Sequence, residues 1–319
     1  MKEIGGYFEL ELNEGAEYHN NSIRLNTGRN ALEYILLANN YNKIYLPFFI
    51  CDSLLEPLRR HDIEVDFYLI DDQFEPIFDF STIEDASGFL YVNYFGLKDS
   101  FVHSLKQKCK NLIVDNSQSF FSKPEPNTDT FYSARKFFGV PDGAYLYTNK
   151  PLPFPLDMDQ SYNRCLHLLM RKDIGPQPGY GSFLQNEHYL CNQQIKKMSR
   201  LTQAILCNIN YEKIRKRRIE NFNFIHENIA STNKLKLSTD AVYSPMVYPY
   251  WCTDKGLKDR LHKNKIFTAT YWDDVKKRRT ADSLEYKFTE EIVYLPIDQR
   301  LTKRNVALIL KIIRNEYSG

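Results

Sequence analysis

The sequence has few cysteines, and none of them is spaced like a metal ligand. Its six cysteines are scattered along 319 residues, with no CxxC pair and no tight cluster of cysteine and histidine. A structural zinc site needs such ligands close together, so we expect no metal. Disulfide bonds are not needed either, because a chain of this length buries enough apolar surface to fold without them.

Long apolar runs are also absent. No stretch approaches 18 apolar residues without a charge, so we expect no transmembrane helix. The first fifteen residues, MKEIGGYFELELNEG, contain no continuous apolar segment of the kind found in secretory signals. The sequence therefore predicts a cytoplasmic protein that does not bind a membrane.

An excess of charge of one sign is missing as well. Lysine and arginine total 42, aspartate and glutamate total 40, and the net charge is +2. This balance gives no electrostatic reason to expect a nucleic-acid partner. The one basic run, KIRKRR at 213–218, falls within a helical pattern, where a solvated helix face is a commoner role than a binding patch.

Apolar residues are plentiful: 43% of the chain is hydrophobic, which is enough for a sizeable core, and the length suggests about two domains. In the first half, short apolar runs alternate with helical patterns. We expect helices over 29–39, 52–61 and 101–110, and strands over 44–48, 64–70, 88–95, 112–116, 130–134 and 144–148. This alternation is typical of a mainly parallel sheet covered on both faces, so the predicted fold class is α/β.

The second half has a different pattern. Residues 157–230 read as mostly helical, with helices over 198–209 and 211–229 and a Pro/Gly loop at 176–182. Further on we expect strands over 242–251, 266–272 and 292–297, and helices over 256–264 and 302–317. The sequence thus predicts a large α/β domain over residues 1–234 and a small α+β domain over residues 235–319.

Three places put reactive or polar groups where strands end, which is where open α/β sheets bind ligands. The first is Asn26-Thr27-Gly28-Arg29 at a helix start, where free backbone N–H groups can hold a phosphate. An ordinary helix cap is the alternative reading. The second is Asp115, which directly follows an apolar strand and can hold a protonated ring nitrogen, or can simply cap a loop.

The third place is the segment YSARKFFG around Lys136. A lysine amine in a partly desolvated pocket has a lowered pKa and can form a Schiff base. Ser133, three residues earlier, can add a hydroxyl group to a phosphate site. A surface lysine beside an apolar turn is the alternative. The order of phosphate cup, strand-end carboxylate and lysine favours the functional reading over the three alternatives.

With these motifs the chain resembles the DegT/DnrJ/StrS-type sugar-nucleotide aminotransferases, which are fold-type-I enzymes that use pyridoxal 5'-phosphate (PLP). The resemblance is carried by LNTGRNALEYIL, VNYFG, VDNSQSFF, ARKFFGVPDGAYLYTN and YLPIDQR, and it runs through most of the chain. It implies a large, mainly parallel α/β/α sheet domain and a small C-terminal α+β domain.

The resemblance also implies residue roles. Lys136 would carry the cofactor and shuttle a proton, Asp115 would pair with the pyridine nitrogen, and Gln118 would contact the region of the ring's phenolic oxygen. The residues implied around the phosphate are Thr27, Gly28, Arg29 and Ser133. Cys51 stands where the family usually places an aromatic that stacks on the ring; a plain buried cysteine is the alternative.

The function implied is amination of a nucleotide-linked keto-sugar, with glutamate as the amino donor, by a symmetric homodimer. The family often has Asn-x-Arg before the helix at 198, where the asparagine reaches the neighbouring subunit's cofactor. This chain has Ile195 and Lys197 at those positions, so Lys197 or Asn192 is the candidate for a group that reaches across. Two alternatives stay open: another PLP reaction on the same fold, and a PLP- or sugar-binding homologue without turnover. Lys136 argues against the family's dehydratase branch, which has histidine there.

Overall fold

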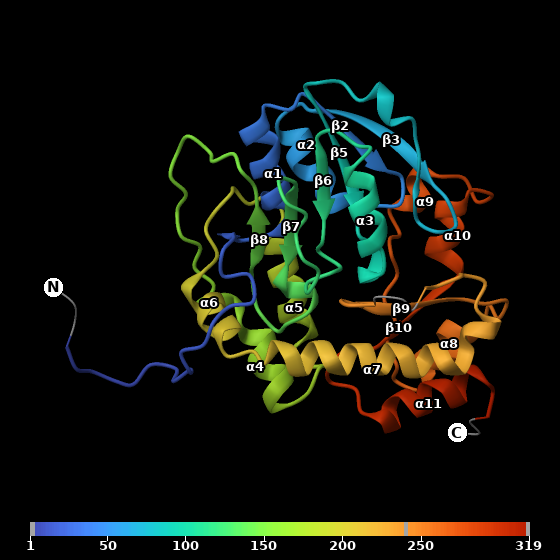
Figure 1. Ribbon diagram of the computed structural model, residues 1–319. Helices are drawn as coiled ribbons and strands as arrows, with labels where there is room; N and C mark the ends of the chain where they lie inside the picture. The colour runs from blue at the N-terminus through green and yellow to red at the C-terminus, as the bar shows by residue number, and fades with distance from the viewer. Residues whose placement is uncertain (1–3, 239–241, 317–319) are drawn as a thin grey trace.

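The computed structural model describes residues 4–238 and 242–316. Its main feature is an eight-stranded sheet in the order β1-β8-β7-β6-β5-β2-β3-β4. The strands are β1 (Ile23–Leu25), β2 (Lys43–Pro47), β3 (Glu64–Ile70), β4 (Pro76–Ile77), β5 (Ser87–Val92), β6 (Leu112–Asp115), β7 (Asp129–Ser133) and β8 (Ala144–Tyr147). Figure 1 shows this sheet with helices around it. The predicted α/β class with a large, mainly parallel sheet is confirmed.

The centre of the sheet is parallel, and its two middle strands are buried on both faces. β2, β3, β5, β6 and β7 pair in parallel, and every residue of β5 and β6 is buried. Such strands need no alternation of polar and apolar residues, which is why they appear in the sequence as unbroken apolar runs. The helices that connect them are α1 (Gly28–Asn39), α2 (Leu55–Arg60) and α3 (Asp99–Lys106).

Four helices follow the sheet: α4 (Leu166–Asp173), α5 (Tyr180–Tyr189), α6 (Arg200–Cys207) and α7 (Tyr211–Ile229). The helix predicted over 211–229 is present with the same bounds. The loop predicted at 176–182 is wrong in its second half, because α5 begins at Tyr180. Gly181 lies inside this helix, where a glycine costs about 1 kcal/mol relative to alanine and is tolerated.

The C-terminal part contains a two-stranded antiparallel sheet of β9 (Val247–Trp251) and β10 (Ile292–Pro296), with α8 (Leu257–Lys263) and α11 (Lys303–Ile313). Figure 1 shows α11 beside α7, and the two helices pack together. Their shared apolar core includes Phe222 and Ile225 of α7. The division of the chain at residue 234 therefore remains a proposal, in which α7 serves both parts.

The strand predicted over 266–272 is wrong. Among the described residues, a single bridge, between Ala269 and Tyr294, links that segment to a strand. Its aromatic residues instead fill the junction with the large sheet: the Tyr271 ring lies 4.8 Å from that of Tyr294, and the Trp272 ring lies 5.1 Å from that of Phe49. Two short helices that we did not predict follow, α9 (Val275–Arg278) and α10 (Leu284–Glu291).

No helix in the described part of the chain is both long and apolar enough to cross a membrane.

Candidate functional site

The predicted site residues follow strands that run in the same direction. β7 is parallel to β6, β8 is antiparallel to β7, and β1 is antiparallel to β8, so β1 runs with β6. β2 and β5 also run with β6. The carboxyl ends of these strands share one edge of the sheet, and the predicted residues lie there: Thr27, Gly28 and Arg29 after β1, Cys51 after β2, Asp115 and Gln118 at β6, and Ser133 and Lys136 at β7.

Lys136 and Asp115 meet through Ser117. The Lys136 amine donates a hydrogen bond of 3.0 Å to the Ser117 hydroxyl, and the Ser117 backbone N–H donates one of 2.7 Å to the Asp115 carboxylate. Asp115 is buried at 4% exposure, whereas Lys136 is exposed in this single chain. Burial raises the pKa of Asp115, and the Lys136 charge and the Ser117 hydrogen bonds oppose that rise.

Gln118 follows Asp115 by three residues, and only the oxygen of its side-chain amide has a hydrogen-bond partner among the described residues. Its side-chain oxygen accepts a hydrogen bond of 2.8 Å from the Phe95 backbone N–H. Its amide nitrogen is buried and has no hydrogen-bond partner among the described residues. A buried donor without an acceptor costs about 1–3 kcal/mol, so this nitrogen is suited to an acceptor that a ligand brings.

A buried polar network fixes the turn that carries these groups. The Asn93 amide donates to the Asn116 side-chain oxygen at 3.0 Å and to Asp99 at 2.6 Å, and the Ser122 hydroxyl also donates to Asp99 at 2.6 Å. The Asn116 backbone N–H donates to the carbonyl of Phe131 on β7 at 2.8 Å. Such a network holds the end of β6 rigid with respect to β7.

The residues of the predicted phosphate cup lie at the start of α1. Thr27 is the N-cap residue, and its hydroxyl accepts a hydrogen bond of 3.2 Å from the Asn30 backbone N–H. A Cβ built on Gly28 would be 3.8 Å from the Phe131 ring, which places Gly28 beside β7, two residues before Ser133. The Arg29 guanidinium is turned to Glu56, with which it forms an ion pair of 2.5 Å.

Cys51 lies at the same edge but is less closely connected. Its sulfur accepts a hydrogen bond of 3.1 Å from the Ser53 hydroxyl, and its side chain is half-buried. Among the described residues, no hydrogen bond joins Cys51 to Asp115 or Lys136. The structure thus connects Asp115 and Lys136 through Ser117, and it places Cys51 and Ser133 only at the same edge.

Ser117 is the site residue that we did not single out from the sequence. The signal that could have found it is its place in the segment VDNSQ, between Asp115 and Gln118. A serine two residues after a strand-end aspartate offers both a backbone N–H to the carboxylate and a hydroxyl to a neighbouring group.

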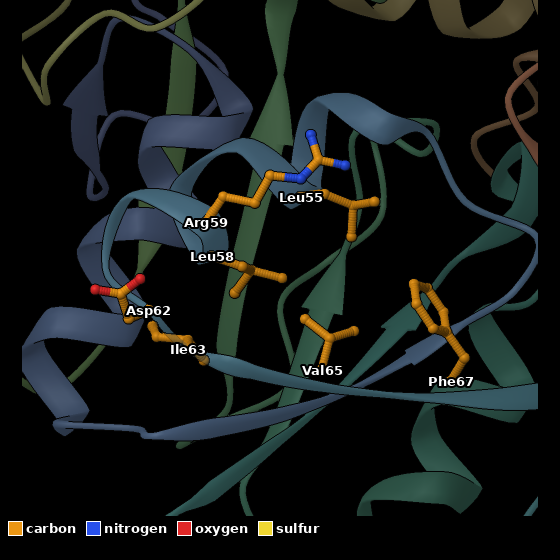
Figure 2. Close-up of a pocket in the computed structure, with 7 residues that line it drawn as sticks. All are labelled: Leu55, Leu58, Arg59, Asp62, Ile63, Val65 and Phe67. Carbon is orange, nitrogen blue, oxygen red and sulfur yellow. The ribbon is translucent and has the colours of Figure 1, made fainter.

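A concavity of about 440 Å³ lies elsewhere, between α2 and β3. Figure 2 shows its lining, in which Leu58, Val65 and Phe67 face the hollow. Its charged residues are Arg59 and Asp62, and it contains none of the predicted site residues. It offers no grouped polar side chains for chemistry.

The solved structures that resemble this chain share one fold. No protein-family model matches the chain, and no curated protein matches it in sequence. Solved structures do match. A DegT DnrJ EryC1 StrS aminotransferase from Brucella abortus is 15% identical, with a TM-score of 0.62 over 93% of this chain and 86% of that chain. The sugar aminotransferase CalS13 from Micromonospora echinospora is 13% identical, with a TM-score of 0.60 over 94% and 88% of the respective chains. DesV from S. venezuelae, solved with a ketimine intermediate, is 13% identical, with a TM-score of 0.63 over 93% and 85%.

These likenesses define the class to which the fold belongs. The chain has the fold of the DegT/DnrJ/EryC1/StrS aminotransferases over most of its length, as the sequence resemblance predicted.

Proposed function

We propose that this protein is a PLP-dependent aminotransferase in which Lys136 carries the cofactor. Its proposed substrate is a nucleotide-linked keto-sugar, and glutamate is the proposed amino donor. The observation that carries the proposal is the link from the Lys136 amine through Ser117 to the buried carboxylate of Asp115. The fold supports it, because structures with this fold include sugar aminotransferases.

The residues at this edge fit PLP. Asp115 is a buried carboxylate with a raised pKa, and a protonated ring nitrogen would supply the cation that stabilises its charged form. The unpartnered Gln118 amide would meet an oxygen of the ring. Thr27, Ser133 and the free N–H groups at the start of α1 would hold the phosphate, with Arg29 nearby. Cys51 would pack against the ring.

PLP, when bound, supplies an electron sink that makes the proton on the carbon beside the amino group removable. The chain's own residues would then do two things. The Lys136 amine would accept that proton and return it, and the Ser117 hydroxyl would orient the amine. Asp115 would keep its negative charge under the ring nitrogen, held in direction by the Ser117 N–H.

The proposed assembly is a homodimer, and an exposed apolar surface beside the lysine loop supports it. Leu166 and Leu169 on α4 are 53% and 64% exposed. α4 borders the loop, since a Cβ built on Gly139 would be 3.5 Å from Leu168. We call the exposed side chains of α4 and α5 the α4–α5 face: Leu166, Leu169, Tyr180, Phe183, Leu184 and Tyr189. A second copy over this face would cover the exposed Lys136 and exclude water from it.

A second candidate function is PLP or sugar binding without turnover. The observation that favours it is Cys51, a thiol that packs on a ring less well than an aromatic side chain does. The presence of Ile195 and Lys197 in place of the family's Asn-x-Arg also favours binding without turnover.

One experiment tests the main proposal and separates it from the second candidate. The purified protein is mixed with PLP, its visible spectrum is recorded, and the complex is reduced with borohydride and mapped by mass spectrometry. We expect the cofactor on Lys136, no trapping in Lys136→Ala, and normal trapping in Lys123→Ala, an exposed lysine on a nearby loop. Loss of the visible band on adding glutamate supports turnover. A stable band supports binding only, and native trapping in Lys136→Ala would remove Lys136 from the site.

A further inference from the structure

Arg218 on α7 is a buried cation held by neutral partners. It is 2% exposed and forms no ion pair among the described residues, although the charge of Asp298 acts on it and raises its pKa. Its guanidinium instead donates to the side-chain oxygen of Gln299 at 3.0 Å and to the carbonyls of Pro245 and Met246 at 3.3 and 3.1 Å. Burial lowers the pKa of Arg218 to about 10, so the residue is still charged at neutral pH.

The guanidinium of Arg218 and the amide of Gln299 both contact Phe137, the residue that follows Lys136. The Arg218 guanidinium lies over the Phe137 ring, 4.4 Å from its centroid. The Gln299 amide donates a hydrogen bond of 2.8 Å to the Phe137 carbonyl. The ring and the backbone of Phe137 are therefore fixed by two side chains that are themselves hydrogen-bonded to each other.

The Phe137 ring also packs against the rings of Phe120, Phe121 and Phe138, and the backbone beside Lys136 forms a short local turn. Lys136 is the last residue of one short 3₁₀ turn, Ala134–Lys136, which closes with hydrogen bonds of 3.1 and 2.9 Å from Phe137 and Phe138 to the Ala134 carbonyl. A single turn of this kind is not rigid by itself. The direction of the Lys136 side chain thus depends on where Phe137 is held.

The partners of Arg218 come from distant parts of the chain. Pro245 and Met246 belong to the segment that leads into β9, and Gln299 belongs to the turn between β10 and α11. Burying a guanidinium is expensive, and the charge of Asp298, which raises the pKa of Arg218, offsets only part of the effect of burial. Arg218 holds these two segments together by hydrogen bonds, and its contact with the Phe137 ring and the hydrogen bond from Gln299 to Phe137 join them to the lysine loop.

We propose that Arg218 and Gln299 are positioning residues that clamp Phe137 and thereby aim the Lys136 amine at Ser117 and Asp115. The clamp also couples the lysine loop to the C-terminal β9–β10 unit, so that a shift of that unit would move Lys136. The chemical consequence rests on the proposed function, whereas the mechanical link between Arg218, Gln299 and Phe137 does not.

The mechanical link is tested on the full chain without cofactor, by amide hydrogen exchange. The variants are Arg218→Met and Gln299→Leu, with Arg217→Met as the matched control one position earlier on α7, where the side chain is 38% exposed. We expect exchange in peptides spanning 136–140 to be faster by about tenfold in both test variants, with β5 and β6 unchanged. Unchanged exchange at 136–140 in folded variants would overturn the clamp. Gln299 is only partly buried, so Gln299→Leu decides the matter if Arg218→Met does not fold.

The consequence for Lys136 is tested by pH titration of the visible band of the PLP-loaded protein. We expect the midpoint to move by at least about half a pH unit in Arg218→Met and Gln299→Leu, to return part of the way in Arg218→Lys, and to stay unchanged in Arg217→Met. If the wild-type protein does not bind PLP through Lys136, the proposed function is contradicted. Hydrogen exchange then tests the clamp independently. Wild-type protein that traps PLP at Lys136, with variants that titrate identically, overturns the positioning role alone.

Discussion

Among single residues, Asp115 has the clearest electrostatic cost. Its carboxylate is 4% exposed, and burial raises its pKa above the ordinary value of 3.8. A group whose pKa is higher in the folded protein than in the unfolded chain binds its proton more tightly in the folded state. Above pH 3.8, the free energy of unfolding therefore falls as the pH rises, until Asp115 has ionised in the folded protein as well. Without a cationic ligand, the ionised form is a destabilising element at neutral pH.

Asp115→Asn should therefore stabilise the cofactor-free protein and inactivate it. The amide keeps an oxygen for the Ser117 N–H and carries no charge, so we expect the free energy of unfolding at pH 7 to rise by about 1–2 kcal/mol. Turnover should fall by at least about a hundredfold, because a neutral amide does not stabilise a protonated ring nitrogen. Urea unfolding and a glutamate-dependent assay measure the two effects.

Measuring stability and turnover together separates a loss of chemistry from a loss of folding. A variant that is less stable and inactive would mean that Asp115 only supports the turn, and near-normal turnover would remove it from the site. Asp99, which is half-buried, also has a raised pKa and belongs to the network behind the turn, gives the comparison: Asp99→Asn should leave most of the turnover.

Some residues of the site could be predicted from the sequence, and others could not. Asp115 and Lys136 could be proposed because a strand-end carboxylate and a lysine between aromatic residues are visible as patterns. The ion pair between Arg29 and Glu56 could not, because its partners are 27 residues apart on different helices. Ser117 was passed over because a serine in a turn has many local roles.

At the scale of elements, predictions succeeded where local patterns and burial agree. The strand over 64–70 and the helix over 211–229 have the predicted bounds. The segment 266–272 failed, because its alternating aromatic residues serve contacts on several sides rather than one face of a sheet. β1 was missed, because three residues are too few to show a period.

The start of α6 depends on a residue of the lysine loop. Asp142 is fully buried and accepts hydrogen bonds of 2.8 Å from both the backbone N–H and the hydroxyl of Ser199, the N-cap residue of α6. It also accepts a hydrogen bond from the Thr202 hydroxyl. The loop that carries Lys136 and the helix that follows are thus joined by one carboxylate.

Asp142→Ala should lower the free energy of unfolding by about 2–4 kcal/mol, because it leaves the Ser199 backbone N–H and the Thr202 hydroxyl, both buried, without this acceptor. Asp142→Asn, which keeps one good acceptor, should lose about half as much. Asp157→Ala, which removes an exposed carboxylate nearby, is the control and should change stability by less than about 0.5 kcal/mol. Guanidinium unfolding measures all three, and a loss in Asp142→Ala no larger than in the control would contradict the capping role.

At the scale of the whole molecule, His19 makes the fold sensitive to acid. It is 2% exposed, its Nε2–H donates to the Phe120 carbonyl at 2.7 Å, and its Nδ1 accepts from the Tyr147 hydroxyl at 3.1 Å. Burial lowers its pKa to about 4, from 6.5 in the unfolded chain. The unfolded state therefore binds the proton first, and stability is lost as the pH falls from 6.5 towards 4.

Between pH 7.5 and pH 5.0 this one residue should remove about 2 kcal/mol from the free energy of unfolding, on the order expected for a pKa lowered this far. His19→Gln keeps a donor and an acceptor but does not titrate. It should be less stable than the wild type at pH 7.5 and should lose about 2 kcal/mol less on acidification. Denaturant unfolding at the two pH values gives the difference, and equal losses in both proteins would show that His19 is not the sensor.

Assembly is the last property set by the whole molecule. The N-terminal segment extends away from the body in Figure 1, and Tyr7 and Phe8 within it are 98% and 93% exposed. With the α4–α5 face, this leaves more exposed apolar surface on one chain than a monomer usually tolerates. The face also borders the lysine loop, through the bond from the Asn186 amide to the Pro141 carbonyl at 2.9 Å and the ion pair of Arg135 with Glu187.

Charge placed on this face should therefore dissociate the protein. Leu166 and Leu169 are three residues apart on α4, on the same side of the helix. In a dimer buried over them, two glutamates would be unpaired charges costing several kcal/mol each. Sedimentation velocity at about 10 µM should give a dimer for the wild type, a monomer for the double variant Leu166→Glu/Leu169→Glu, and a dimer for Ile77→Glu, whose side chain on β4 is 59% exposed. The monomeric variant should also bind PLP more weakly, because nothing then covers the exposed Lys136. A wild-type monomer that binds PLP tightly would contradict the homodimer and would favour the binding protein without turnover.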